Sequence, residues 1–394
     1  MPYYTGQRNI WPNLSYNAAM PDPQTSPILI VPYMWIGDFV RGHSVVKLLK
    51  SLAPGRPVDL LATANAAPLA DYMPGVRRAI VTDLPRRRIG VSLQRQLAAA
   101  LRKEDYGQAL VMSRKWKAAL APFLAGIPLR TGFAGEARFG LLNDMRWGES
   151  KLPRMIDQCA SLALPAGAPL PAEWPLPQLV VPPAELAAWR ARHALTAPRR
   201  VVALAPGAVG ASKRWPGFGA LAAALVAQGH EVWIVGSPNE TAQAKEIQRD
   251  IVQQNAAGEP QHRDHGGDRV RDLTGTDLRN AIRALAAADV AVSNDSGLLH
   301  VAAALGTPSI GIFGPTDPWL WAPLNPLAAV IAADSALDCR PCHEPTCRLG
   351  HHRCMRDIAT EQVLRAVDAA LKNPSARMAK IAPSNIASAT RAQG

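Results

Sequence analysis

The sequence predicts an α/β protein built from two Rossmann-like, parallel-sheet domains that face a central cleft. Short apolar runs rich in Val, Ile and Leu alternate with segments of helical composition, which is typical of parallel strands covered by helices. The alternation occurs twice, and a proline-rich stretch separates the two series. At 394 residues the chain is long enough for two domains, each with its own core.

The first series opens with ILIV at residues 28–31, a short apolar run that predicts a buried strand. The following PYMWIGDFVRGHSVVKLLKSL is predicted to be a glycine-containing turn that leads into a helix. Further strands are expected at 58–62, 79–81 and 108–112, with helices at 69–73 and 92–103. We assign residues 28–175 to this first domain.

The stretch between the two series carries seven prolines between Leu162 and Pro183. Proline fixes φ and lacks an N–H donor, so we expect a linker, which we place at 176–190. The first 27 residues are polar and proline-rich without the apolar core of a secretory signal, and we expect a flexible extension at 1–27. A flexible tail is expected at 374–394.

The second domain is predicted at 191–373, where the alternation of strands and helices restarts. The expected strands are 201–205, 231–235, one near 272–273, 290–292 and 309–313, and the expected helices are 217–228, one from about 240, 278–287 and 298–305.

Charge is unevenly distributed along the chain, whose formal net charge is +12. Residues 1–180 hold 21 Lys and Arg against 12 Asp and Glu, an excess of +9, whereas the rest holds 22 against 19, an excess of +3. A basic first domain favours an anionic partner, and a plain solvated basic surface is the alternative. Every apolar run is far shorter than the roughly 20 residues that cross a bilayer, so we expect a soluble cytoplasmic protein.

The stretch SNDSGLLHVAAALGTP, residues 293–308, places polar residues where a buried strand leads into a helix. In an open α/β sheet such a turn presents free backbone N–H groups and the positive end of the helix dipole to a ligand. A simple helix cap would explain either Asp295 or Ser296, but would leave Gly297 and His300 unexplained. We therefore expect a ligand site here.

Three other loops that follow predicted strands carry residues suited to binding or catalysis. Asp38 in MWIGDF has the chemistry of a general base or of a helix cap. PGAVGASKRWP combines glycines and a hydroxyl with the cations Lys213 and Arg214, a combination suited to phosphate. In GSPNE, either Asn239 or Glu240 has the chemistry to bind ribose hydroxyls.

Two classes of protein fit these patterns poorly. A dinucleotide-dependent dehydrogenase requires GxGxxG soon after its first strand, and neither 28–31 nor 201–205 is followed by that motif. A nucleic-acid-binding protein would interleave its basic clusters with aromatic residues, and the clusters here lack that pattern.

The motifs MWIGDF, PGAVGASKRWP, NDSGLLHVAAALGTPSIGIFGPTDP and CRPCHEPTCRLGHHRCMRDI resemble glycosyltransferase family 9 over roughly residues 28–370. Within that family the chain is most similar to the lipopolysaccharide heptosyltransferases, particularly the heptosyltransferase II branch. The resemblance implies a GT-B fold whose first domain binds the acceptor and whose second binds the sugar nucleotide. It also implies that a closing helix at 361–371 packs back toward the first domain.

The resemblance further implies an inverting transfer of L-glycero-D-manno-heptose from ADP-heptose to the heptosyl-Kdo-lipid A inner core, in lipopolysaccharide core biosynthesis. Such an enzyme would be peripheral, on the anionic cytoplasmic face of the inner membrane, with no nucleic acid partner and no required cofactor or catalytic metal. Another GT-B nucleotide-sugar enzyme, with a different donor or acceptor, is the alternative.

The resemblance also implies a role for each polar residue of the four loops. Asp38 would be the base, and Asp295 would accept hydrogen bonds from heptose hydroxyls, with His300 beside the phosphate or sugar. Glu240 would bind the adenosine ribose, with Asn239 as its competitor. The donor pyrophosphate would be held by Ser212, Lys213 and the N–H groups of Ser296, Gly297 and Leu298.

Four of the five cysteines cluster late in the sequence, at Cys339, Cys342, Cys347 and Cys354. A C-x2-C pair with two further cysteines nearby can supply a structural zinc site, although these spacings match no familiar zinc finger. Reduced thiols that pack a loop are the alternative, because disulfides are not expected in a reducing cytoplasm. Cys159 stands apart and is expected to be a small buried residue.

Overall fold

The computed structural model describes residues 22, 25–85, 88–136, 138–152, 154–193, 199–257, 269–333 and 336–372. The predicted tail at 374–394, and all but four residues of the predicted extension at 1–27, lie outside the described residues. The chain divides into two compact units between Val180 and Val181. Residues 277–279 and 319–324 group with the first unit, and the remainder of the chain after Val180 forms the second.

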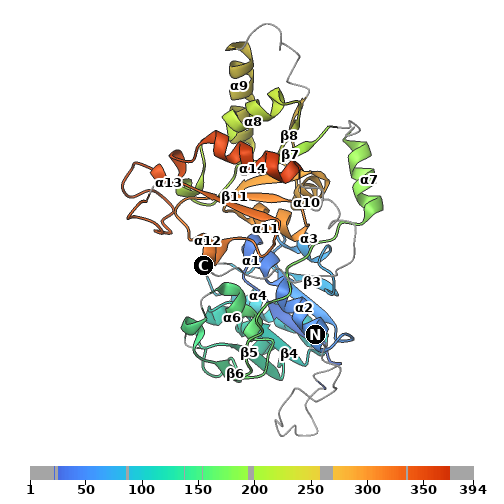
Figure 1. Cartoon of the computed structure of the whole chain (residues 1–394). Coiled ribbons are helices and arrows are strands. Elements are labelled where there is room, and N and C mark those ends of the chain that lie inside the picture. The colour runs from blue at the N-terminus through green and yellow to red at the C-terminus, as the bar shows by residue number, and fades with distance from the viewer. Residues whose placement is uncertain are drawn as a thin grey trace. The chain divides into compact units, whose positions relative to one another are not determined.

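The first unit is built on a six-stranded parallel sheet with the order β3-β2-β1-β4-β5-β6 (Figure 1). Its strands are β1 (Ile28–Val31), β2 (Val58–Ala62), β3 (Arg78–Val81), β4 (Gln108–Val111), β5 (Leu129–Phe133) and β6 (Asp144–Arg146). Its helices are α1 (Ile36–Arg41), α2 (His43–Leu52), α3 (Ala67–Ala70), α4 (Val91–Arg102), α5 (Leu120–Leu124) and α6 (Met155–Ser161).

The central strands of this sheet are buried on both faces, which explains their mainly apolar sequences. Ile30 of β1 pairs in register with Leu60 of β2 and Leu110 of β4. Helix α4 buries Leu97 and Leu101 in the same core as strand residues of β1 and β4. The predicted strands of the first series are confirmed, with ends that differ by one residue at most.

The second unit is built on another six-stranded parallel sheet, with the order β12-β11-β10-β7-β8-β9. Its strands are β7 (Val201–Ala205), β8 (Glu231–Ile234), β9 (Val270–Asp272), β10 (Val290–Asn294), β11 (Ser309–Phe313) and β12 (Ala328–Ala332). The helices of this half of the chain are α7 (Pro183–Arg192), α8 (Phe218–Ala227), α9 (Thr241–Ala257), α10 (Leu278–Ala287), α11 (Gly297–Ala304), α12 (Pro318–Trp321), α13 (Arg353–Arg356) and α14 (Thr360–Lys372).

Both sheets follow one topology, because each begins in the middle, extends to one edge, and then continues on the other side of its first strand. The reversal falls between β1 and β4 in the first unit and between β7 and β10 in the second. Loops that leave such a pair of strands diverge to opposite faces and open a crevice at the carboxyl ends. The fold therefore provides one ligand-binding position in each unit.

Helix α14 packs on α8 and on β10, β11 and β12, with Val363 and Val367 fully buried in the core of the second unit. The apolar face that Val363 and Val367 share at a spacing of four residues covers the sheet of its own unit.

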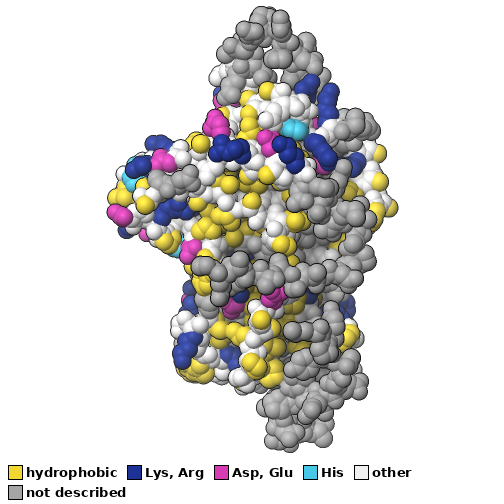
Figure 2. Space-filling view, viewed as in Figure 1, with side chains coloured by type: hydrophobic (Ala, Val, Ile, Leu, Met, Phe, Trp, Pro, Cys, Tyr) yellow, Lys and Arg dark blue, Asp and Glu magenta, His cyan; other side chains and the backbone are white. Residues whose placement is uncertain are grey.

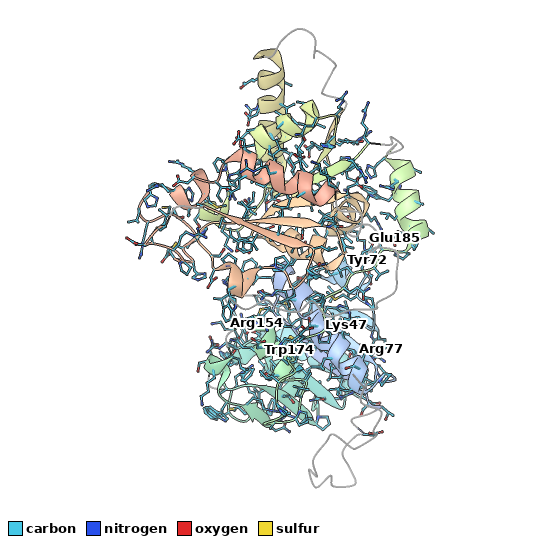
Figure 3. All side chains as sticks on the ribbon, in the orientation of Figure 1. Lys47, Tyr72, Arg77, Arg154, Trp174 and Glu185 are labelled. Atoms are coloured by element: carbon cyan, nitrogen blue, oxygen red, sulfur yellow. The ribbon has the colours of Figure 1, made fainter. Side chains whose placement is uncertain are left out.

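The proline-rich stretch is docked on the first unit up to Val180 and is not a free linker. Trp174 is buried, and its indole N–H donates to Asp157 Oδ1 at 2.7 Å. The same carboxylate binds the guanidinium of Arg154, which lies beside Trp174 in Figure 3. The linker predicted at 176–190 also runs into α7, because Pro183 occupies the first helical turn, where a missing N–H costs no hydrogen bond.

His43 is a buried histidine that joins α2 to this docked stretch. Its Nε2 donates to the carbonyl of Pro74 at 2.8 Å, and its Nδ1 accepts from the N–H of Gln178 at 2.9 Å. A ring that donates from one nitrogen and accepts at the other is neutral. Burial lowers the pKa of His43 to about 4, although the Pro74 carbonyl opposes that shift.

We predict that His43 makes the first unit less stable as the pH falls from about 6.5 to about 4. The unfolded chain binds a proton at His43 in this window and the folded chain does not, so the free energy of unfolding decreases by on the order of 3 kcal/mol. His43→Asn should flatten the dependence of the melting temperature on pH. If the melting temperatures of both proteins fell equally over this pH range, His43 would not be the source of the pH dependence.

Candidate active site

The loops that follow β7 and β10 lie side by side in the second unit, because these two strands pair in register from Val202–Val290 to Ala205–Ser293. They are the two loops that the sequence analysis assigned to phosphate, PGAVGASKRWP and NDSG. Their strands flank the point where the sheet reverses direction. The predicted phosphate-binding loops therefore meet at the crevice position of the fold.

Asn294, the last residue of β10, holds these two loops together. Its side chain is fully buried, and its Nδ2 donates to the carbonyl of Pro206 at 2.6 Å. Its Oδ1 accepts from the backbone N–H of Trp215 at 3.1 Å. One amide thus fixes both ends of the PGAVGASKRWP loop, and nothing in the sequence indicated this role.

Asp295 and Lys213 form an ion pair at the crevice, with 2.7 Å between Lys213 Nζ and Asp295 Oδ2. The hydroxyl of Thr316, after β11, donates to the same oxygen at 2.8 Å. The side chain of Asp295 is 8% exposed and that of Lys213 is 28% exposed. An ammonium group has three donors, so Lys213 retains capacity for an anionic ligand while it holds Asp295.

Helix α11 begins directly after this pair, with Ser296 in an extended conformation at its N-cap. The side chain of Ser296 does not cap the helix, because its hydroxyl lies 3.0 Å from the hydroxyl of Ser293. The N–H groups of Gly297 and Leu298 occupy the first turn, where the helix dipole favours an anion. His300 follows in the same helix and is 7% exposed.

Ser212 has a different environment from the one its predicted role requires. It is fully buried in a 3-10 turn, Ala211–Lys213, and its hydroxyl donates to the carbonyl of Glu344. Its N–H donates to the carbonyl of Pro345 at 3.1 Å. The hydroxyl proton expected on a phosphate is therefore already used to join the loop to the cysteine-rich segment.

Glu240 lies between the loops that follow β7 and β8. A Cβ added to Gly207 would be 2.6 Å from Glu240 Cγ, and one added to Gly236 would be 2.9 Å from Glu240 Cβ, so both loops approach as closely as glycine allows. Glu240 Oε2 accepts from the N–H and the hydroxyl of Ser237 at 2.7 and 2.5 Å. Its competitor for ribose, Asn239, is exposed.

In the first unit, Asp38 lies in the first turn of α1, directly after the β1 loop. Its charge contributes to raised pKa values at Tyr33 and Cys159, which places its carboxylate close to both side chains. Cys159 is buried as expected, and that burial is the main reason why its thiol has a pKa of about 12. Asp38 thus belongs to a cluster of interacting ionisable groups.

Glu149 belongs to the same cluster and was not singled out from the sequence. Burial raises its pKa, while Arg114 and then Arg138 oppose the shift. Arg114, in the loop after β4, binds Glu149 Oε2 at 3.0 Å. The other carboxylate oxygen, Oε1, is buried and has no hydrogen-bond partner among the described residues.

Part of the positive charge of the first unit is paired within the unit. Arg77 and Arg78 both bind the buried carboxylate of Asp59, and Lys115 binds Glu136. Figure 2 shows Lys and Arg side chains interspersed with apolar and acidic ones on the visible face. Among the described residues, no helix combines the length and apolar character needed to span a membrane.

Comparisons with known proteins identify the family. The sequence model of glycosyltransferase family 9 (heptosyltransferase) matches residues 94–353. The chain belongs to this family. Lipopolysaccharide heptosyltransferase 2 of Escherichia coli is 33% identical over 356 residues, which cover 87% of this chain and 98% of the relative. Lipooligosaccharide heptosyltransferase 2 of Haemophilus influenzae is 31% identical over 357 residues, 86% of this chain and 98% of the relative.

A solved structure of E. coli ADP-heptose lps heptosyltransferase II superimposes with a TM-score of 0.74 at 32% identity, covering 88% of this chain and 98% of that one. The two six-stranded parallel sheets with flanking helices confirm the predicted α/β, GT-B class. A more distant structure, E. coli heptosyltransferase WaaC with ADP-2-deoxy-2-fluoro heptose, shares the fold with a TM-score of 0.63 at 18% identity, over 87% of this chain and 99% of that one.

We predict that Asn294→Ala lowers the free energy of unfolding of the second unit by about 2–4 kcal/mol, because the Pro206 carbonyl and the Trp215 N–H lose their buried partner. Chemical denaturation followed by tryptophan fluorescence measures the change. The matched control is Asn65→Ala, an exposed asparagine of the first unit, for which we expect a loss of less than about 1 kcal/mol. Equal losses for the two variants would contradict the role of Asn294.

Proposed function

We propose that this glycosyltransferase moves L-glycero-D-manno-heptose from ADP-heptose to the heptosyl-Kdo-lipid A inner core, with inversion at the anomeric carbon. The observation that carries the proposal is the pairing of Lys213 with Asp295 beside the first turn of α11. A cation, a carboxylate and helix N–H groups lie together at this crevice, which suits a sugar linked to a diphosphate.

The comparisons support the choice of donor and pathway. Curated relatives that span most of the chain are named lipopolysaccharide or lipooligosaccharide heptosyltransferase 2. Related structures of E. coli WaaC contain ADP or ADP-2-deoxy-2-fluoro heptose. Glu240, between the glycine loops after β7 and β8, would bind the adenosine ribose on the side of the crevice away from α11.

The proposed reaction is a single displacement at the anomeric carbon. Asp38 removes the proton from the attacking hydroxyl of the acceptor heptose as the new glycosidic bond forms. The bond to the ADP oxygen breaks in the same step, and negative charge develops on the departing diphosphate. Lys213 and the N–H groups of Gly297 and Leu298 stabilise that charge, which is where fixed donors lower the barrier most.

The acceptor proposal rests on the first unit, where Asp38, Tyr33, Arg114 and Glu149 interact electrostatically at the end of the sheet. The inner core carries Kdo carboxylates, which an arginine binds well. The excess of +9 in residues 1–180 also favours peripheral binding to the anionic cytoplasmic face of the inner membrane.

We predict that Asp38→Asn lowers kcat by about 10²–10⁴-fold and leaves the affinity for ADP unchanged, because the amide keeps the shape of the side chain but cannot accept the proton. The assay is transfer from ADP-heptose to de-acylated heptosyl-Kdo2, with ADP affinity measured by calorimetry. Asp105→Asn, an exposed residue of the first unit, is the control and should retain full activity. Wild-type protein that binds a uridine nucleotide-sugar and ignores ADP-heptose would overturn the proposed donor.

We predict that Lys213→Met weakens ADP binding by about tenfold or more, because a charge-assisted hydrogen bond to a phosphate contributes about 1.5–3 kcal/mol. The single variant also leaves Asp295 unpaired and should unfold more readily. The double variant Lys213→Met/Asp295→Asn removes both charges, so it should recover stability without recovering ADP affinity. Lys245→Met, on the exposed face of α9, is the control, and an equal loss of affinity there would rule out a direct role for Lys213.

A further inference from the structure

The cysteine-rich segment, residues 339–354, is a lobe of loops that precedes α14 and ends in α13 (Figure 1). The transfer reaction proposed above gives these cysteines no role. All four line one small pocket, together with Ser212 and His352. They are free thiols, and none takes part in a disulfide.

We propose that Cys339, Cys342, Cys347 and Cys354 bind one zinc ion, which holds together the cysteine-rich segment that contacts the loop carrying Lys213. Four sulfur ligands favour zinc, or iron as the second choice, over the harder cations that prefer oxygen. The pocket lining contains neither Asp nor Glu, so its ligands are thiols and histidines alone.

Two tight turns present the cysteines to the pocket. In the first, the N–H groups of Cys342 and His343 both donate to the carbonyl of Pro315, at 2.9 and 3.0 Å, and His343 has a φ of 56°. In the second, Gly350 has a φ of 71° and donates to the carbonyl of Cys347 at 3.1 Å. Each turn thus has a left-handed residue within three positions after a cysteine, and its backbone is held by these hydrogen bonds.

The second turn surrounds the sulfur of Cys347 with backbone donors. The N–H groups of His352 and of residues 349–351 lie within hydrogen-bonding range of this sulfur. Such donors favour the thiolate, which is the form that binds a metal. The turn therefore prepares one ligand before any ion is present.

Cys354 and His352 face the same space. Cys354 is buried, and Cys339, Cys342 and Cys347 each lie within electrostatic range of it. His352 Nε2 is buried and has no hydrogen-bond partner among the described residues. A zinc-bound thiolate would accept a hydrogen bond from that nitrogen, and metal ligands are commonly oriented by hydrogen bonds of this kind.

The four cysteine side chains must rotate before they can coordinate the ion. Among the described residues, no three Cys, His, Asp or Glu side chains converge closely enough to hold a metal. The backbone already brings the four thiols around one pocket, so rotation about the Cα–Cβ bonds is the movement that binding requires. The proposal thus predicts a local closure of the pocket when zinc binds.

The same segment supports the donor loop. Glu344 and Pro345, between the second and third cysteines, accept the hydrogen bonds from Ser212 described above. Gly210 has a φ of 94°, and a Cβ there would lie 3.1 Å from Pro345. Zinc would therefore immobilise Glu344 and Pro345, against which the loop packs. Loss of the zinc ion should weaken ADP binding several-fold.

The test measures metal content in the full chain, purified without a polyhistidine tag or chelator. Plasma mass spectrometry should find about one zinc ion per chain. Cys342→Ser and Cys347→Ser should each lose the ion, whereas Cys159→Ala, a buried cysteine of the first unit, should retain it. Metal content is read without substrate, so the result is independent of the proposed transferase reaction.

A second measurement covers variants that fail to fold. Adding Co²⁺ to metal-depleted wild-type protein should produce the visible bands of tetrahedral cobalt with thiolate charge transfer. Protein that contains no zinc as purified and gives no such spectrum overturns the site. Iron bound by the same four cysteines overturns the assignment to zinc, and unchanged ADP affinity after metal removal overturns the supporting role.

Discussion

The buried amide of Asn294 is the constraint on which the proposed donor site depends. It fixes the start of the PGAVGASKRWP loop through Pro206 and its end through Trp215. The residue after it, Asp295, pairs with Lys213 from inside that loop. Because one strand end holds both loops, cation, carboxylate and helix N-terminus keep a single arrangement, which is what electrostatic stabilisation of a leaving group requires.

The two units use one topology for opposite chemistry. At the β7–β10 reversal the fold collects a lysine and helix N–H groups around a carboxylate, an arrangement that suits diphosphate. At the β1–β4 reversal it collects Asp38 and Glu149 near Tyr33, with arginines as counter-charges. Repeating the sheet therefore gives one chain a crevice suited to an anion and another suited to proton removal.

Strands and loops that depend on local sequence pattern could be predicted from the sequence. Strands and site residues whose place depends on long-range contacts could not. Strands such as β7 and β11 are buried on both faces, so their apolar runs identify them. Strands β5 and β6 were missed because they lie next to or at a sheet edge, are only partly buried and lack such runs. Strand β12 is apolar throughout, but it is a partly exposed edge strand that no turn motif or helix pattern marked. Thr316 and Glu149 contact their partners, Asp295 and Arg114, only because of the fold, and no motif in the sequence indicates these contacts.

The docked proline-rich stretch has a practical consequence for dissecting the protein. Trp174 and Gln178 contribute buried contacts to the first unit, although their sequence has the composition of a spacer. A fragment ending near residue 165 would therefore expose apolar surface and aggregate. Autonomous expression of the N-terminal half requires a terminus after Val180.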